Sequence, residues 1–297
     1  MSLAMNWIEL SVVTDAEGAE AVAALLNGFV SGGAAIEETL EEPIDPARAF
    51  TVRAFFSSSD VAGLERAETA LWHLAQVRAM SASQRRELAE EDWAEAWKKH
   101  YTILHLGKML VVKPSWLEYT PQPREVIVEL DPGMAFGTGL HPTTRQCLIA
   151  LEERVTQDAR VLEVGTGSGI LAITAAKLGA RETLALDTDP IAVEQAARNV
   201  AINRVGGSVR VERGSIDAAR DRAPFDLICI NILAEVICDL APELAATLRP
   251  RGIVIASGIL DFKADGVMDA LRAVGIEIVE RKQEEDWTTL VGMKRDA

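Results

Sequence analysis

From Thr143 onward the sequence alternates short apolar segments with longer helical ones, and this alternation restricts the fold more than any other feature. Apolar segments such as "RVLEVG" and "FDLICIN" are typical of strands buried on both faces. Such an alternation predicts a doubly wound, Rossmann-like α/β sheet with helices on both sides. Strands are predicted over 160–165, 183–187, 208–214, 225–231, 252–258, 276–283 and, antiparallel, 287–294, and helices over 143–155, 168–180, 189–204, 240–250 and 264–275. Ligands bind such sheets beyond the carboxyl ends of the strands.

The amino-terminal part has a different pattern. Strands are predicted over 7–13, 34–39, 49–57 and 77–81, and helices over 16–29 and 60–76. The order strand–helix–strand–strand–helix–strand predicts a small ferredoxin-like α+β domain over residues 1–80. A helical segment with acids early and lysines late follows, and we interpret residues 81–100 as a linker helix. The segments 107–116 and 124–130 are expected to be extended, within a second domain that spans 101–297.

Composition restricts the class of protein further. The chain has 297 residues, 48% of them hydrophobic, which is enough for a sizeable core. No apolar run approaches the ~20 residues of a membrane span, and the first residues do not resemble a secretion signal. Three cysteines, Cys147, Cys229 and Cys238, form no CxxC pair and are expected to be buried. We therefore expect a cytoplasmic protein that is not bound to membranes.

The net charge of −15 is concentrated near the amino-terminus. Residues 1–100 contain 17 acidic and 8 basic residues, a net charge of −9. This surface repels the phosphates of nucleic acids and favours a basic partner, although acidic surfaces also serve solubility alone.

Three glycines, Gly165, Gly167 and Gly169, directly follow a predicted strand and precede a helix. They permit a tight turn and a close approach of the backbone to a ligand. The spacing GxGxG differs from the dinucleotide fingerprint GxGxxG, and a purely structural turn is the alternative.

The next strand ends at Asp187, about twenty residues after the glycines, where a carboxylate can accept hydrogen bonds from both hydroxyls of a ribose. An ordinary solvated acid is the alternative reading. Asp189 precedes Pro190, a pair that suits a helix N-cap, so we assign Asp189 to structure.

The strand over 225–231 ends at Asn231, whose amide can hold a ligand or orient a substrate nitrogen, with helix capping as the alternative. The segment "DPGMAFGTGLHPTT", from Asp131 to Thr144, contains three glycines and lacks the lysine of a phosphate-binding loop. His141 lies in this segment, and we do not assign it to catalysis. The four histidines lack the spacing of metal ligands, so no metal site is predicted.

These segments resemble Class I S-adenosylmethionine-dependent methyltransferases in "EVGTGSGILAITAAKLGA", "LDTDPIAVEQAARNVAIN" and "INILAEV". With "DPGMAFGTGLHPTT", "EDWAEAWKKHY", "VVKPSW" and "SGIL", the chain resembles the bacterial ribosomal protein methyltransferases of the PrmA type, which modify large-subunit protein eleven. The motifs cover residue 87 to the carboxyl-terminus. The amino-terminal part agrees with the family only in its architecture.

The resemblance implies S-adenosyl-L-methionine as cofactor. Its contacts would be Thr144, Gly165, Gly167, Asp187 and Asn231, with Asn231 also the catalytic residue that orients the substrate nitrogen. The glycine-rich segment that ends at Thr144 would wrap the methionyl end of the cofactor. At position 163 many relatives have Asp where this chain has Glu, which keeps the carboxylate but changes its reach.

The resemblance further implies methylation of lysine side chains and the N-terminal amine of a basic large-subunit ribosomal protein, recognised by the amino-terminal domain. We expect a monomer without direct contact to nucleic acid. Within the same fold, another protein, a glutamine or a small-molecule amine remains an alternative substrate. The sequence "NILA" lacks the N-P-P-[YF] run of enzymes that methylate bases or glutamine. An NAD-dependent dehydrogenase and a non-catalytic binding module are the remaining alternatives.

Overall fold

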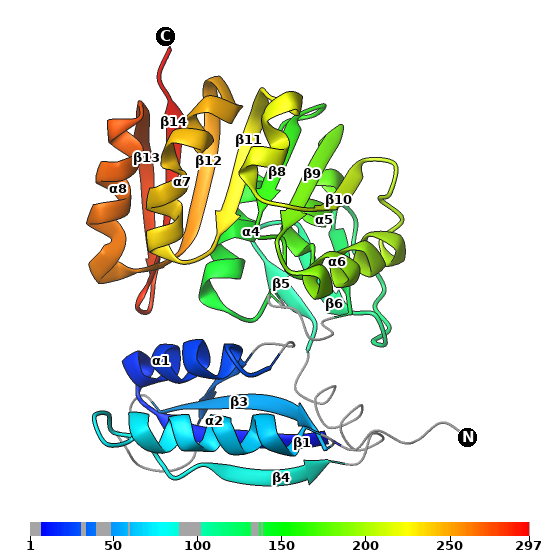
Figure 1. Ribbon diagram of the computed structural model, residues 1–297. Coiled ribbons are helices and arrows are strands. Elements are labelled where there is room, and N and C mark those ends of the chain that lie inside the picture. The colour runs from blue at the N-terminus through cyan, green and yellow to red at the C-terminus, as the bar shows by residue number, and fades with distance from the viewer. Residues whose placement is uncertain are drawn as a thin grey trace. The chain divides into compact units, whose positions relative to one another are not determined.

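The structure is a computed structural model that describes residues 7–30, 34–39, 49–58, 60–88, 102–131, 137 and 139–296 (Figure 1). The chain divides into two compact units, Met1–Tyr101 and Thr102–Ala297. Most of the predicted linker helix, and residues 132–136 and 138 of the glycine-rich segment, lie outside the described residues. Within the described residues, no helix has the length and apolar character needed to cross a membrane.

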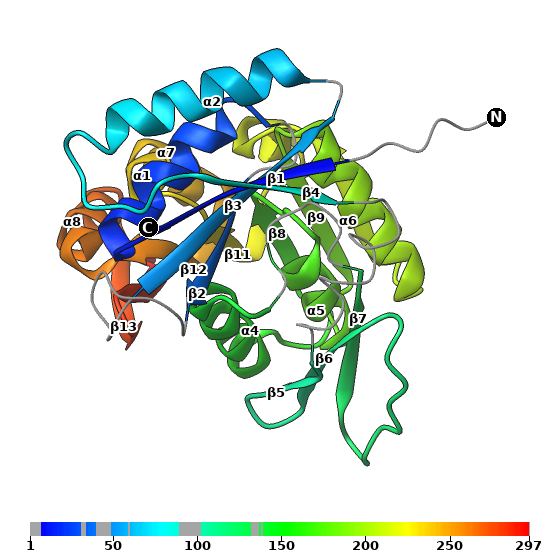
Figure 2. The same ribbon diagram turned by 90° about the horizontal axis from the view of Figure 1, so that it is seen from below.

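The first unit is an antiparallel sheet with two helices on one side (Figure 2). Its sheet order is β2-β3-β1-β4. The elements are β1 (Trp7–Thr14), α1 (Ala16–Asn27), β2 (Ala35–Thr39), β3 (Ala49–Ser57), α2 (Val61–Leu74) and β4 (Gln84–Leu88). Alternate residues of β1 and β3 are buried, among them Leu10 and Val52, and they share one core with Leu26 of α1 and Leu64 of α2. This period of two is what places one face of the sheet against the helices.

The last strand of this unit was predicted at 77–81, and that position is wrong. Met80 forms only a single bridge with Thr14, and Val77 is exposed. The strand that pairs with β1 on the side opposite β3 is β4, so the sheet extends past residue 80 into the segment predicted as linker. The residues Gln84–Glu87 are exposed and mostly charged, as is common for edge strands, which avoid pairing with other chains. Apolar periodicity therefore pointed to the wrong segment.

The second unit contains a seven-stranded sheet of order β10-β9-β8-β11-β12-β14-β13. Its strands are β8 (Arg160–Val164), β9 (Glu182–Asp187), β10 (Val209–Arg213), β11 (Phe225–Asn231), β12 (Leu248–Leu260), β13 (Ile276–Glu284) and β14 (Trp287–Lys294). The pairs β10–β9, β9–β8, β8–β11 and β11–β12 are parallel, whereas β14 pairs antiparallel with both β12 and β13. The predicted doubly wound class with an antiparallel last strand is confirmed.

Two buried cores cover the two faces of this sheet. One contains residues of α4 (Pro142–Arg154), α5 (Ile170–Lys177) and α6 (Pro190–Ile202), and the other residues of the 3-10 helix η2 (Ile216–Arg222), α7 (Ala234–Thr247) and α8 (Ala264–Ala273). Figure 1 shows α7 and α8 in front of the sheet and α4 behind it. Helix α7 begins at Ala234 rather than at the predicted residue 240, and β12 is longer than predicted. Pro242 suits a helix start, but it lies inside α7 between the buried Ile237 and Leu244.

A small sheet of β5 (Leu104–Leu106), β6 (Leu110–Pro114) and β7 (Val126–Leu130) precedes α4 (Figure 2). Two buried side-chain amides, at and near the end of α6, form hydrogen bonds with the edge strand β7 and the residue that follows it. Asn203 accepts from the Glu129 backbone N–H at 2.9 Å and donates to the Glu129 carbonyl at 2.5 Å, and Asn199 makes the equivalent pair of bonds to Asp131. These bonds fix the start of the glycine-rich segment beside the main sheet.

Candidate functional site

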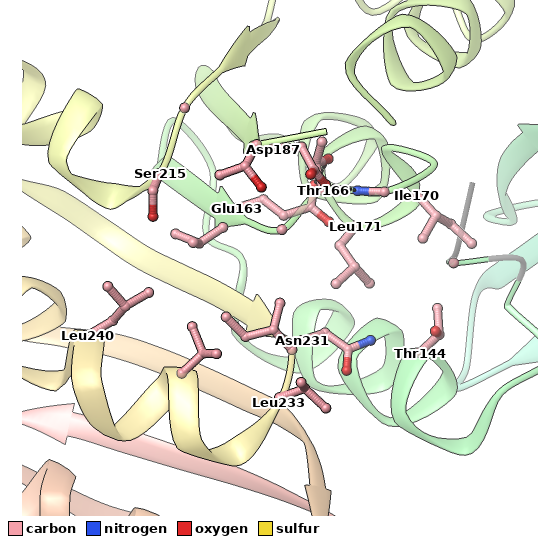
Figure 3. A pocket seen from close by; sticks show the side chains of 18 residues that line it. Thr144, Glu163, Thr166, Ile170, Leu171, Asp187, Ser215, Asn231, Leu233 and Leu240 are labelled. Atoms are coloured by element: carbon pink, nitrogen blue, oxygen red, sulfur yellow. Dashed lines mark hydrogen bonds between the residues drawn. The ribbon is translucent and has the colours of Figure 1, made fainter. Parts of the chain in front are cut away.

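A cavity of about 420 Å³ lies at the carboxyl ends of β8, β9 and β11 (Figure 3). The sheet order changes direction between β8 and β11, which is where open α/β sheets bind ligands. The residues predicted to bind cofactor, namely Thr144, Gly165, Gly167, Asp187 and Asn231, all line this cavity. Four different elements of the chain therefore converge there, as the sequence predicted.

The turn from β8 into α5 brings backbone to the cavity. Gly165 has a φ of 77°, and a Cβ built on it would lie 2.5 Å from Cγ2 of Ile232. Any side chain at this position would be strained in its backbone and would collide with its neighbour. The Gly167 backbone N–H donates to Oδ2 of Asp187 at 2.9 Å, which joins the turn to the end of β9.

The Asp187 carboxylate is oriented by two backbone donors. Besides the Gly167 bond, its Oδ1 accepts from the Asp189 N–H at 3.0 Å. Each carboxylate oxygen has two lone pairs, so both retain acceptor capacity toward the cavity. Asp189 itself is the N-cap of α6 and accepts from the Ile191 N–H at 2.8 Å, which confirms its predicted structural role.

Asn231 is held by the turn that follows it. The Ile232 N–H donates to the Ser257 carbonyl at 3.2 Å, and Ile232 fits between two glycines, Gly165 and Gly258. Gly258 has a φ of 81°, and a Cβ there would collide with the Ile232 carbonyl. The N-cap of α7 is Leu233, so the alternative reading of Asn231 as a helix cap is wrong.

Helix α4 presents its first turn to the cavity. Its N-cap is His141, whose Nδ1 accepts from the Thr143 N–H at 3.3 Å, and Pro142 occupies the first helical position. Thr144 is buried, and its Oγ1 has no hydrogen-bond partner in the described structure. A hydroxyl at a helix N-terminus, where the helix dipole is positive, suits an anionic ligand group. Figure 3 shows Thr144 and Asn231 along one side of the cavity.

Glu163 also lines the cavity, and the sequence did not predict it as a site residue. Its side chain is 1% exposed. Oε2 accepts from Thr166 Oγ1 at 2.6 Å and from the Ala172 N–H at 2.9 Å, whereas Oε1 has no partner among the described residues. Burial raises the pKa of this carboxyl to about 8, and the nearby Asp187 charge adds to the rise. An acid inside the apolar strand "RVLEV" was the available signal, because a buried carboxyl requires a partner.

His141 lies outside the cavity lining. Its ring packs edge-on against Trp287 with centroids 4.8 Å apart. Burial, together with the Arg145 charge, lowers the pKa of His141 to about 4, so the ring is neutral at pH 7. This placement agrees with its assignment as a non-catalytic residue.

The remaining wall of the cavity is largely apolar. Its apolar residues are Val164, Ile170, Leu171, Ile232, Leu233, Val236 and Leu240, and Thr166, Thr188, Gly214 and Ser215 also line the cavity. Glu163 and Asp187 are the titratable groups among the described lining residues. The cavity therefore combines one apolar wall with a carboxylate, a buried carboxyl, an amide and a helix N-terminus. Gly137 is the described residue of the loop between 131 and 139 that lines it, and its carbonyl accepts from Ser168 Oγ at 2.5 Å.

Comparisons with known proteins agree over nearly the whole length. The model of the family described as "Ribosomal protein L11 methyltransferase (PrmA)" matches residues 6–295. A ribosomal protein L11 methyltransferase of Chloroflexus aurantiacus is 44% identical over 319 residues, covering 96% of this chain and 97% of its own. One of Pelotomaculum thermopropionicum is 41% identical, covering 96% and 98%. A crystal structure of the ribosomal protein L11 methylase of Lactobacillus delbrueckii subsp. bulgaricus is 35% identical, with a TM-score of 0.60, and covers 66% of this chain and 100% of its own.

Proposed function

The chain belongs to the ribosomal protein L11 methyltransferase family, and we propose on this premise that it methylates amino groups of ribosomal protein L11 with S-adenosyl-L-methionine. The amino groups are lysine side chains and the N-terminal amine. The observation that carries the proposal is the convergence of Thr144, Asp187 and Asn231 on one cavity at the switch point of the sheet.

The residues of the cavity fit this cofactor. Glu163 Oε1 and Thr144 Oγ1 are buried polar atoms without partners in the described chain, and both belong to the cavity wall. A methionyl end has an ammonium and a carboxylate. We assign the ammonium to Glu163 and the carboxylate to Thr144 and the N-terminus of α4. Asp187 holds the ribose hydroxyls, and the apolar wall packs against the base.

When bound, the cofactor supplies a methyl group made electrophilic by a sulfonium sulfur. Asn231 accepts a hydrogen bond from the substrate amine and so directs the nitrogen lone pair. A lysine amine must first lose its proton, which costs about 4.6 kcal/mol at pH 7 for an ordinary pKa of about 10.4. The apolar wall lowers this cost because it excludes water and disfavours the ammonium form. We propose that the ammonium releases its proton to bulk water as it enters the cavity, so that desolvation takes the place of a dedicated base.

We further propose that the first unit recognises the substrate. The strand order β2-β3-β1-β4 is that of a ferredoxin-like domain, and the net charge of −9 over residues 1–100 suits a basic ribosomal protein. The enzyme acts as a monomer in the cytoplasm, where ribosomal proteins are made, without direct contact to nucleic acid.

The decisive experiment incubates the protein with labelled S-adenosyl-L-methionine and unmodified ribosomal protein L11. Mass spectrometry of the product should show mass increases in steps of one methyl group on lysines or the N-terminus. Calorimetry with the cofactor, and with NAD as control, tests the cavity separately. Tight binding of the cofactor without methylation of L11 would mean that another amine is the substrate. Binding of NAD instead would contradict the assignment of the cavity.

A further inference from the structure

Three large apolar side chains are exposed beside the cavity, and we call Leu233, Val236 and Phe262 the apolar rim. Leu233 and Val236 line the cavity wall and are at the same time exposed to solvent. Phe262 follows β12 and is 76% exposed, which is unusual for an aromatic side chain. Exposed apolar groups that adjoin a cavity mark interaction sites.

An ion pair and a cation–π contact link the two parts of the rim. β11 and β12 are parallel neighbours, so the turns after their carboxyl ends lie at the same edge of the sheet (Figure 1). The turn after β11 contains Leu233 and leads into α7, where Glu235 forms an ion pair with Lys263 at 2.8 Å. The same Lys263 Nζ lies 5.6 Å from the centroid of the Phe262 ring. Through Lys263, Phe262 is linked to the first turn of α7, which also contains Val236 of the cavity wall.

The charges next to the rim are paired within the chain. Asp261, which precedes Phe262, pairs with Arg281 at 2.7 Å and accepts from Thr288 Oγ1 at 2.8 Å. Glu235 and Asp261 are thus engaged in ion pairs, and beside them Leu233, Val236 and Phe262 expose apolar area. This surface suits aliphatic or aromatic side chains rather than a single charged group.

We propose that the apolar rim binds the segment of the protein substrate that carries the target amine, through apolar side chains close to that amine in sequence. The inference rests on the proposed function. A lysine side chain is long and thin, so its backbone remains outside when the amine enters the cavity past Leu233 and Val236. The residues beside the lysine then lie over the rim, because the rim is continuous with the cavity wall. Substrates with apolar residues beside the amine gain contacts that a free amine cannot make.

Phe262→Ala tests the rim because Phe262 does not line the cavity. We expect kcat/KM for ribosomal protein L11 to fall about tenfold, equivalent to ~1.4 kcal/mol, with the loss in KM rather than kcat. Phe262→Leu keeps an apolar side chain and should restore most of the loss. The control Val279→Ala removes an exposed apolar side chain from the edge strand β13 and should match wild type. Calorimetry should give wild-type cofactor affinity for all three variants.

A photocrosslinker identifies the occupant directly. With p-benzoylphenylalanine in place of Phe262, irradiation of the full chain with L11 and S-adenosylhomocysteine should yield a 1:1 adduct that maps beside a target amine. An adduct between two copies, an internal crosslink or no adduct with L11 would overturn the proposal. Equal KM values for wild type and Phe262→Ala would overturn it as well. Failure of the wild type to methylate L11 would instead refute the proposed function itself.

Discussion

Replacement of Glu163 by Gln should stabilise the ligand-free second unit and weaken its binding of cofactor. Glu163 is buried, and its pKa of about 8 lies well above the ordinary value of 4.5. Gln resembles the protonated carboxyl in shape and does not titrate. Its carbonyl oxygen can accept the bonds that Thr166 and Ala172 donate to Oε2.

The sign of the pH dependence follows from the two pKa values. Between pH 4.5 and 8 the unfolded chain has released the Glu163 proton while the folded unit retains it. The free energy of unfolding therefore falls as pH rises, by about 1.4 kcal/mol per pH unit. Gln removes this slope, so the stability advantage of the variant should grow by about 4 kcal/mol between pH 5 and pH 8. This change with pH does not depend on the intrinsic cost of introducing Gln.

Thermal unfolding followed by circular dichroism at several pH values measures this effect. For a unit of this size, ~4 kcal/mol corresponds to a growing difference in Tm of roughly 8–16 °C. Glu118→Gln makes the same chemical change at an exposed position and should show no such trend. A stability difference that stays constant from pH 5 to pH 8 would show that Glu163 has no raised pKa, and would refute the reasoning.

The same variant tests the role of Glu163 in binding. A cofactor ammonium beside Oε1 favours the ionised carboxylate, so binding below pH 8 should release a proton from wild type. Calorimetry in buffers of different ionisation enthalpy measures this release, which should be absent in the Gln variant. Affinity should fall at least tenfold, in line with the loss of a charge-assisted hydrogen bond. Unchanged affinity would mean that another group holds the ammonium.

Asn231→Ala should lower kcat about a hundredfold with an unchanged Tm, and near-normal turnover would refute its role in orienting the amine. Gly165→Ala should lower stability by roughly 1–3 kcal/mol and weaken cofactor binding, because φ is 77° and the new Cβ meets Ile232. The control Gly207→Ala has open space and should be neutral in thermal unfolding. His141→Asn keeps a side chain that can cap α4 and removes a group whose pKa is lowered to about 4. As pH falls from 6.5 to 4, the free energy of unfolding of wild type should therefore decrease by up to ~3 kcal/mol relative to that of the variant.

Most of the main sheet could be predicted because its central strands β8, β9 and β11 are almost continuously buried and are followed by turn residues. The failures occurred where neighbouring elements override local patterns. β4 is an exposed edge strand whose charged residues give no apolar signal, and α7 continues through Pro242 because its apolar face is buried. Neither the partner strand of β4 nor the packing of α7 is encoded within the segment itself.

In the candidate site, too, some features could be predicted from the sequence and others could not. Asp187 and Asn231 are the last residues of β9 and β11, so the shared edge of parallel strand ends sufficed to bring them together. The position of Ile232 between Gly165 and Gly258 depends on three segments that meet only in the folded sheet. The state of Glu163 likewise depends on its burial beneath the glycine turn, which a local sequence pattern does not reveal.

Two titratable groups near the cavity, the buried Glu163 and the partly buried His141, contribute to the pH dependence of stability with opposite signs. Between pH 4.5 and 6.5, His141 gains stability with rising pH while Glu163 loses it, and the two slopes nearly cancel. From pH 6.5 to 8 His141 contributes no further gain, so only the loss from Glu163 remains. At neutral pH the ligand-free unit is thus destabilised by a carboxyl that is buried without a charged partner. A bound ammonium supplies that partner, so cofactor binding and folding of the second unit reinforce one another in this pH range.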